Sequence, residues 1–371
     1  MHRIDTATAD ADANGTGKAG FRPGAPPGVA STRLDEDWFN AVQEEIALSV
    51  EGLGGTLDKT SHKQLLAAIQ RQAVKAALAS IKLADDLGAG TINAIARSAA
   101  GRTTVVGSSS LIAFSTGHDG FTAETAAAAS DFVDIVYDAT HSLFIAVGSN
   151  GSVQTSPGSG TWTQQVTGVS TFKAIATDGA GHSVAVGAGE RLWSSANGTS
   201  WASRTSPFAG TPDIVSVAFG AGVFVMVTNQ GDIASSGDFG ITWTVRQALA
   251  GSTSGGGGPH VAYHASLGFI YHYVANVYRS ADGIAWTQIH NAAQSSTETP
   301  GLLVTPYCWM IGRASGGNGT AIDGRFSPTA INAAIDFRAD YIVADGLTAL
   351  KLVDGQLMGV AGSKIFVGGV L

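Results

Sequence analysis

A short turn that ends in tryptophan occurs four times in this chain, and its spacing limits the fold more than any other feature. The copies end at Trp162, Trp201, Trp243 and Trp286, so they follow one another at a nearly constant interval. A weaker copy ends at Phe121, one further interval before the first tryptophan. A repeat of about 40 residues is typical of propellers and solenoids, because each unit is too small to bury its own apolar face.

Each turn begins at a serine and places an acid or amide and a glycine before the tryptophan. Short polar side chains can accept hydrogen bonds from nearby backbone N–H groups, and glycine supplies the positive φ that a tight corner needs. We therefore expect the turns to be structural ends of hairpins and not ligand sites. The three fullest copies are Ser195-Ala-Asn197-Gly198-Thr-Ser-Trp201, Ser236-Gly-Asp238-Phe-Gly240-Ile-Thr-Trp243 and Ser280-Ala-Asp282-Gly283-Ile-Ala-Trp286.

The turns resemble the Asp-box, or bacterial-neuraminidase repeat, whose pattern is Ser-x-Asp-x-Gly-x-x-Trp. The copies that contain Asp238 and Asp282 match it best, Asn197 departs mildly, and the copy from Ser156 to Trp162 has no acid. The resemblance implies a β-propeller with one such turn in each blade.

A second repeated element agrees with this period. An apolar strand ends at Gly107, Gly148 and Gly187, and these glycines follow one another at the same interval as the tryptophans. The pattern weakens after Trp286, and the last residues supply three strands without a fourth. We expect a mainly β protein with a propeller of about seven blades over residues 97–371, closed by both ends of the chain. Six blades is the alternative count, because residues 312–350 are poorly phased.

The first hundred residues differ in character from the repeats. Residues 1–20 are small and polar, which predicts a flexible segment. Residues 21–96 predict a small α-helical module that ends in a link to the repeats over 82–101. Its first helix carries an apolar stripe and stops near Gly52, and its second runs from Ser61 to about Ile81. The stripe of the first helix contains Trp38, Val42 and Ile46, with Phe39 beside it.

This region also resembles a known family. The segments are Phe21-Arg-Pro-Gly-Ala-Pro-Pro-Gly28, Thr32-Arg-Leu-Asp-Glu-Asp-Trp-Phe-Asn-Ala-Val-Gln-Glu-Glu-Ile46, Leu57-Asp-Lys and Gln64-Leu-Leu-Ala-Ala-Ile69. They are similar to the N-terminal module of bacteriophage tail fibre proteins. The resemblance implies a virion component that attaches through this module to other tail or baseplate proteins, usually as a homotrimer.

Composition excludes several classes of function. The net charge is −8 and no basic cluster occurs, so we expect no nucleic-acid partner. The single cysteine, Cys308, can form no internal disulfide, and we expect no metal site or cofactor. No run of about 18 apolar residues occurs, which predicts no membrane insertion. The start of the chain lacks the apolar core of a signal peptide, so we expect synthesis in the host cytoplasm.

Because Asp-box propellers include sialidases, glycoside hydrolysis is the enzymatic alternative. A sialidase-like site needs three arginines on a carboxylate, a tyrosine nucleophile with a carboxylate partner, and an acid. No arginine lies on an expected innermost strand, and glutamate is almost absent from the repeats. We therefore expect that the chain is not an enzyme.

One segment suggests ligand binding. Aromatic and imidazole side chains suit sugar faces and hydroxyls, and they gather between residues 259 and 278. The alternative is that alternate members of these strands are core and the others are solvated. The candidate receptor contacts are His260, Tyr263, His264, Tyr271 and Tyr273. The longest expected loops, at 251–259 and 312–334, are further candidate contacts.

The sequence thus predicts a structural protein of the phage tail that presents a propeller for host attachment. The host receptor is expected to be a surface glycan or protein. The alternative is a purely structural baseplate or adaptor protein that touches no receptor.

Overall fold

A computed structural model gives the fold of the chain. It describes Thr16, Leu57 and residues 36–52, 64–79, 82–88, 90–168, 170–247, 260–273, 276–291, 298–304, 309–315, 319–325, 337–341, 349–353 and 356–370. The chain divides into two compact units, Met1–Val74 and Lys75–Leu371.

Two helices precede the strands. Helix α1 (Glu36–Gly52) ends at a glycine, as its sequence predicts, because glycine stops a helix readily. Helix α2 (Gln64–Ala79) begins three residues after the expected capping serine and is rich in alanine. The division between the two units falls within α2.

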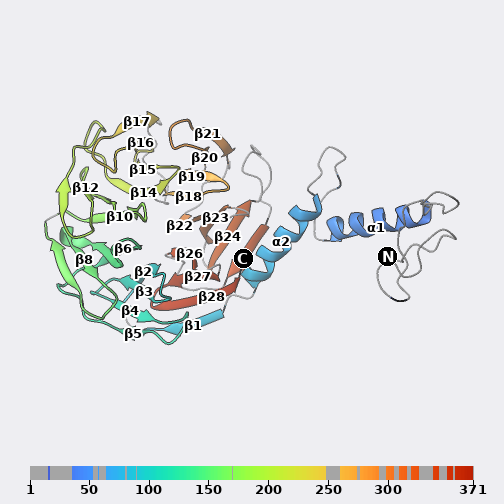
Figure 1. Cartoon of the computed structure of the whole chain (residues 1–371), viewed down its shortest axis with the longest axis horizontal. Coiled ribbons are helices and arrows are strands. Elements are labelled where there is room, and N and C mark those ends of the chain that lie inside the picture. The colour runs from blue at the N-terminus through green and yellow to red at the C-terminus, as the bar shows by residue number, and fades with distance from the viewer. Residues whose placement is uncertain are drawn as a thin grey trace. The chain divides into compact units, whose positions relative to one another are not determined.

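Seven four-stranded antiparallel sheets account for all the strands of the part of the chain that the structure describes (Figure 1). We number the sheets in chain order, and within each sheet we give the strands from the innermost to the outermost. The first sheet contains β2 (Ile92–Arg97), β3 (Thr103–Gly107), β4 (Ile112–Ser115) and β5 (Thr122–Ala123). The second contains β6 (Phe132–Asp138), β7 (Leu143–Gly148), β8 (Val153–Ser156) and β9 (Thr163–Val166). The third contains β10 (Phe172–Thr177), β11 (Ser183–Gly187), β12 (Leu192–Ser195) and β13 (Trp201–Ser203).

The remaining sheets follow the same order. The fourth contains β14 (Ile214–Gly220), β15 (Val223–Thr228), β16 (Ile233–Ser236) and β17 (Thr244–Gln247). The fifth contains β18 (His260–His264), β19 (Gly268–Tyr273), β20 (Asn276–Ser280) and β21 (Thr287–Asn291). The sixth contains β22 (Glu298–Val304), β23 (Trp309–Ser315), β24 (Gly319–Arg325) and β25 (Phe337–Tyr341). The seventh contains β26 (Ala349–Val353), β27 (Gln356–Ala361), β28 (Lys364–Val370) and, on its outer edge, β1 (Lys82–Asp86).

The sheets form a closed ring. Each innermost strand contacts the innermost strand of the next sheet, and β26 of the seventh sheet contacts β2 of the first. Strand β1 supplies the fourth strand that the C-terminal residues lack, pairing Lys82 with Val367 and Asp86 with Lys364. Both ends of the propeller sequence therefore build the seventh sheet, which protects a strand edge that would otherwise be open.

Two expectations from the sequence need correction. The propeller begins at Lys82 and not at residue 97, because β1 and β2 both belong to its sheets. Strand β1 reads Lys-Leu-Ala-Asp-Asp and lacks the β-branched and aromatic residues by which strands are recognised. The expected loop at 312–334 contains the C-terminal end of β23 and the whole of β24, and these two strands pair along their length, from Trp309 with Arg325 to Ser315 with Gly319.

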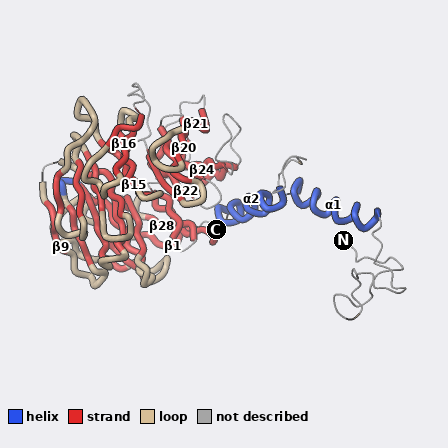
Figure 2. Tube along the Cα trace, turned by 45° about the horizontal axis from the view of Figure 1, so that its top comes forward, coloured by secondary structure: helices blue, strands red, loops and turns tan. Residues whose placement is uncertain are grey.

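The core lies in the seams between neighbouring sheets and not within single sheets. Along β7, for example, Phe144 and Ala146 pack toward the first sheet, while Ile145 and Val147 pack toward the third. Strands of the middle positions are therefore buried on both faces. Figure 2 shows that strands and loops make up the propeller. A short 3-10 turn, η1 (Ser149–Gly151), lies between β7 and β8.

Polar side chains of the innermost strands link several neighbouring sheets. The Asn93 amide donates to the Phe132 carbonyl at 2.7 Å, and the Ile175 N–H donates to the Asp134 carboxylate at 3.0 Å. At the closure, Lys351 of β26 donates to the Ile95 carbonyl of β2 at 2.8 Å. These bonds satisfy polar groups that the ring would otherwise bury unpaired.

Candidate binding surfaces

The tryptophan turns are fastened by hydrogen bonds within the turn itself. In the fourth sheet, the Gly240 N–H donates to Ser236 Oγ at 2.9 Å, and Ser236 Oγ donates to Asp238 Oδ1 at 2.8 Å. Asp238 also accepts the Thr242 N–H, and the Trp243 indole donates to the Gly240 carbonyl at 3.1 Å. Burial is the largest single influence on the pKa of Asp238 and raises it. The hydrogen bonds from Thr242, Ser236 and Ile241 favour the carboxylate and together outweigh burial, so the pKa of Asp238 is lowered. The polar groups of the turn are therefore used by the fold.

The turns of the third and fifth sheets repeat this arrangement. Ser195 and Ser280 accept the N–H groups of Gly198 and Gly283, at 2.9 and 2.8 Å. Asn197 and Asp282 each accept two further backbone N–H groups. The indoles of Trp201 and Trp286 donate to the carbonyls of the turn glycines at 2.9 and 3.4 Å.

Each turn also packs against the preceding sheet. A Cβ atom added at Gly240 would lie 2.4 Å from Val184 Cγ2, and one at Gly283 would lie 2.7 Å from Val225 Cγ2. Only glycine permits this approach, and both positions have φ above +70°. Trp162, Trp201, Trp243 and Trp286 each pack in the seam between their own sheet and the one before it.

The aromatic and imidazole cluster of the fifth sheet does not form one exposed platform. Tyr271 and Tyr273, which were candidate receptor contacts, lie in the core with 0% and 6% of their surface exposed. Both are on β19, a middle strand whose residues are all buried, and both pack in the seam with the fourth sheet. The expected alternation of core and solvated residues therefore fails there, and these two tyrosines are structural. Burial raises the pKa of the Tyr271 hydroxyl, and the neighbouring Tyr273 raises it further.

The other candidates on β18 are half-buried and point to separate neighbours. The ring of Tyr263 lies against Gly220 of the fourth sheet, and His264 Nδ1 lies 2.9 Å from the hydroxyl of Ser266. The Nε2 atom of His260 is buried and has no hydrogen-bond partner among the described residues. Burial, followed by the nearby His272, lowers the pKa of His260 to about 4. The candidate loop at 251–259 lies outside the described residues.

Arg97 corrects another expectation. It ends the innermost strand β2, where no arginine was expected. Its guanidinium donates to the Thr103 hydroxyl at 2.5 Å and to the Gly117 carbonyl at 3.1 Å, so it fastens the first sheet. In the described part of the chain, no three His, Cys, Asp or Glu side chains are placed to hold a metal ion. None of the described helices is long and apolar enough to cross a membrane.

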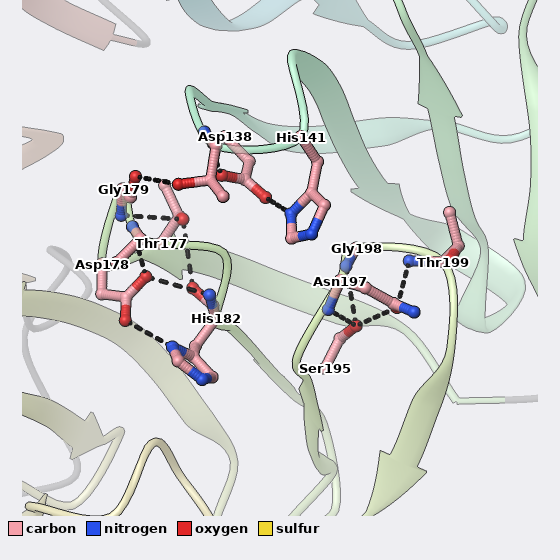
Figure 3. Close-up of polar contacts among 12 residues, drawn as sticks. Asp138, His141, Thr177, Asp178, Gly179, His182, Ser195, Asn197, Gly198 and Thr199 are labelled. Carbon is pink, nitrogen blue, oxygen red and sulfur yellow. Dashed lines mark hydrogen bonds and ion pairs between the residues drawn. The ribbon is translucent and has the colours of Figure 1, made fainter.

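Sequence reasoning missed two aspartate–histidine pairs in neighbouring hairpins (Figure 3). Asp138 Oδ2 lies 2.7 Å from His141 Nδ1, and Asp178 Oδ2 lies 2.7 Å from His182 Nδ1. Both aspartates are buried, with 0% and 4% of their side chains exposed. The nearby hydroxyl of Ser195 bonds within its own turn, so neither imidazole activates it. The second pair follows the first at the interval of the repeat, a signal that was present in the sequence.

Sequence reasoning also missed exposed apolar side chains at equivalent places in neighbouring turns. Phe239 and Ile241 in the turn of the fourth sheet are 48% and 50% exposed, and Ile284 in that of the fifth is 46% exposed. The third sheet has the polar Thr199 where these turns have isoleucine. Phe239 has a φ of 62°, which bulky residues rarely adopt, and its ring stacks on His182 at 3.9 Å. We call Phe239, Ile241 and Ile284 the apolar rim residues.

The expected attachment residues on α1 differ in exposure. Phe39 and Ile46 are 48% and 45% exposed, whereas Trp38 and Val42 are half-buried. The rings of Trp38 and Phe39 meet edge to face, with centroids 5.4 Å apart. On α2, Leu66 and Ile69 are 54% and 52% exposed.

Comparison with known proteins supports the fold and adds one relative. No protein-family model matches the chain. A segment of 71 residues is 49% identical to the uncharacterized protein StfP of Escherichia coli (strain K12). That match covers 19% of this chain and 34% of the relative, so the chain spans about a third of the relative's length.

Several solved structures share the fold. YCF48 bound to D1 peptide has a TM-score of 0.56 and 11% identity, covering 78% of this chain and 94% of that one. YCF48 from Cyanidioschyzon merolae has a TM-score of 0.57 and 12% identity, covering 78% and 98%. Sqt1 of Saccharomyces cerevisiae has a TM-score of 0.52 and 12% identity, covering 75% and 82%. At such identity the likeness shows the fold alone: the chain is mainly β and its strands form a β-propeller.

Proposed function

We propose that this chain is a virion protein of a bacteriophage tail, a tail fibre or baseplate-associated protein whose propeller attaches the particle to the host. The observation that carries this proposal is the similarity of residues 21–69 to the N-terminal module of tail fibre proteins. In that role the helical module fastens the chain to other tail proteins, and the propeller is the part that is presented. We propose no catalytic activity for it.

The exposed apolar side chains of the helices support self-association through the module. Phe39 and Ile46 of α1, and Leu66 and Ile69 of α2, are each about half exposed in a single chain. Burying such side chains between copies is favourable by about 25 cal/mol for each Å² removed from water. We propose a homotrimer, as the similar module usually forms.

Light scattering on the full chain tests the homotrimer. The double variant Ile46→Ser, Ile69→Ser should shift the mass toward a monomer, whereas Glu44→Gln on the same helix should leave it unchanged. A wild-type chain that is monomeric at all concentrations would contradict trimerisation in solution.

The propeller suits presentation because the serines of its described tryptophan turns hold the turn backbone by hydrogen bonds. One solved structure with this fold is YCF48 bound to D1 peptide, so a propeller of this kind serves there as a binding module. For the present chain, the partner that we propose is a host surface glycan or protein.

The alternative is a purely structural baseplate or adaptor protein. The apolar rim residues Phe239, Ile241 and Ile284 favour it, because exposed apolar groups also suit permanent contacts with other virion proteins. Locating a label on the propeller in intact particles separates the two functions. A propeller that projects from the distal end of the tail supports attachment, whereas one that is enclosed by baseplate subunits leaves only the structural role.

A further inference from the structure

A cavity of about 470 Å³ lies in the seam between the seventh and first sheets. Its walls come from β1 and the residues that follow it on one side, and from β4, β5 and the turn before β4 on the other. All of these residues belong to the unit Lys75–Leu371. The volume is within the range of about 300–1,000 Å³ that is typical of small-molecule sites.

The cavity is found where the tryptophan of the repeated turn is missing. The turns of the second to fifth sheets each place an indole in the seam with the preceding sheet. The turn of the first sheet places Phe121 there, and Phe121 lines the cavity. A phenyl ring is smaller than an indole. Phe121 therefore fills less of the seam between the seventh and first sheets than tryptophan fills in the other seams.

The polar lining of this cavity has one sign of charge. It contains the carboxylates of Asp85, Asp86 and Glu124 and no lysine, arginine or histidine. Glu124 is already paired with Arg102. Hydrogen bonds from the Ser363 hydroxyl and the Gly88 N–H lower the pKa of Asp86, so its carboxylate is an acceptor at neutral pH. An anionic ligand would therefore be repelled.

The turn beside the cavity departs from the usual choice of residues. Ser109 and Ser110 have φ of 57° and 62°, in the left-handed region. The equivalent turns of the second and third sheets use Asn150-Gly151 and Gly189-Glu190, each with a glycine at one of the two positions. Two consecutive left-handed residues favour Asn-Gly or Gly-Gly, and a non-glycine residue costs of order 1–2 kcal/mol there. Such cost is characteristic of functional positions, and both serines line the cavity. The Ser110 hydroxyl already accepts the Ser130 N–H at 3.0 Å.

We propose that this cavity binds an uncharged saccharide ring. The phenyl of Phe121 offers an apolar surface to a sugar face. The carboxylates of Asp85 and Asp86 have lone pairs left to accept sugar hydroxyls beside the N–H groups that they already bind. The Ser109 hydroxyl can both donate and accept. The lining residues supply no cation for the salt bridges that sialic acid or phosphate would need, and Lys364, which pairs with Asp86 across β1 and β28, acts on that carboxylate. This inference rests on the proposed function and assigns the receptor contact to the seam where the two ends of the propeller sequence meet.

The test compares the full-length chain with variants by saturation-transfer NMR and calorimetry. The probes are the methyl glycosides of glucose, galactose and N-acetylglucosamine, with sialic acid and methylammonium as charged probes. We expect at least one neutral probe to bind. Phe121→Trp should fill the seam and weaken binding by about tenfold or more, with unfolding no easier than in wild type. Trp201→Phe, which makes the same exchange in another seam, should leave binding unchanged.

A second variant covers the case in which Phe121→Trp does not fold. Asp86 is exposed, so Asp86→Asn should preserve the fold and weaken the neutral probe several-fold. Binding of none of the neutral probes, binding of a charged probe alone, or equal binding by wild type and both variants would overturn the proposal. The test of host attachment is separate. If the chain binds the sugar but not host cells, the saccharide site stands and the proposed attachment function fails. If the chain binds host cells but no sugar, the attachment function stands and the saccharide site fails.

Discussion

The indole Nε1 of Trp162 donates a hydrogen bond of 3.0 Å to the carboxylate of Glu124, which belongs to the preceding sheet. In the third to fifth sheets the same indole atom donates to the glycine carbonyl of its own turn. Glu124 also pairs with Arg102, whose guanidinium lies 3.6 Å from the centre of the Phe114 ring. In the second sheet the indole hydrogen bond therefore links two sheets through Glu124, whereas in the third to fifth sheets it stays within one turn.

We predict that Glu124→Ala destabilises the protein by about 3–5 kcal/mol, because it leaves the buried guanidinium of Arg102 without its partner. Trp162→Phe, which removes only the indole donor and some packing, should cost clearly less. Urea denaturation followed by circular dichroism measures both. Equal and small losses for the two variants would show that Glu124 is not central to this seam.

Truncating the turn tryptophans should give graded losses. Trp162 is 6% exposed, and its replacement by alanine should cost about 3–5 kcal/mol as a large-to-small core change. Trp201, Trp243 and Trp286 are half-buried. Replacing any one of these three by alanine should lower the free energy of unfolding by less, and by a similar amount in each case. If stability were unchanged while ligand binding was lost, the turns would be binding sites and not scaffold.

His260, which is half-buried with its Nε2 atom enclosed, predicts a dependence of stability on pH. Its pKa is about 4 in the folded chain and about 6.5 when exposed, so the unfolded chain binds the additional proton first as the pH falls. The unfolding free energy should therefore decrease as the pH falls from about 6.5 to about 4, by up to roughly 3 kcal/mol from this group. The variant His260→Gln should lose that part of the dependence. An identical pH profile for wild type and variant would contradict the burial of this ring.

The role of β1 predicts different behaviour for two fragments. Fragment 80–371 retains β1 and β2, whereas fragment 97–371 lacks them and exposes the edge of β28. We expect fragment 80–371 to be a folded monomer with a cooperative thermal transition, and fragment 97–371 to aggregate. Size-exclusion chromatography with thermal unfolding distinguishes them. A monomeric, equally stable fragment 97–371 would mean that β1 does not close the ring.

The period of the repeats was readable from the sequence because each unit carries the same turn and the same apolar strand. The seven sheets, the innermost strands and the closure by both chain ends follow from that period. Strand β1 was not readable, since Leu83 and Ala84 are its only apolar residues and its place depends on pairing with β28, at the far end of the propeller sequence.

The candidate site was predicted less well, for a physical reason. In this fold both faces of a middle strand are covered, so Tyr271 and Tyr273 are core although aromatic residues also suit ligands. The exchange of tryptophan for Phe121 was visible in the sequence. Its consequence was not, because a smaller side chain leaves a cavity only where the neighbouring sheet does not fill the space.

The central claim is that the propeller attaches the particle to its host, and competition for adsorption tests it most directly. Fragment 80–371, once shown to be folded, is added in excess to host cells before the phage, with the heat-unfolded fragment as control. The account predicts that the folded fragment reduces adsorption in proportion to its concentration and that the unfolded one does not. Adsorption that stays unchanged at every concentration of folded fragment would contradict the account and leave the propeller a structural part of the tail.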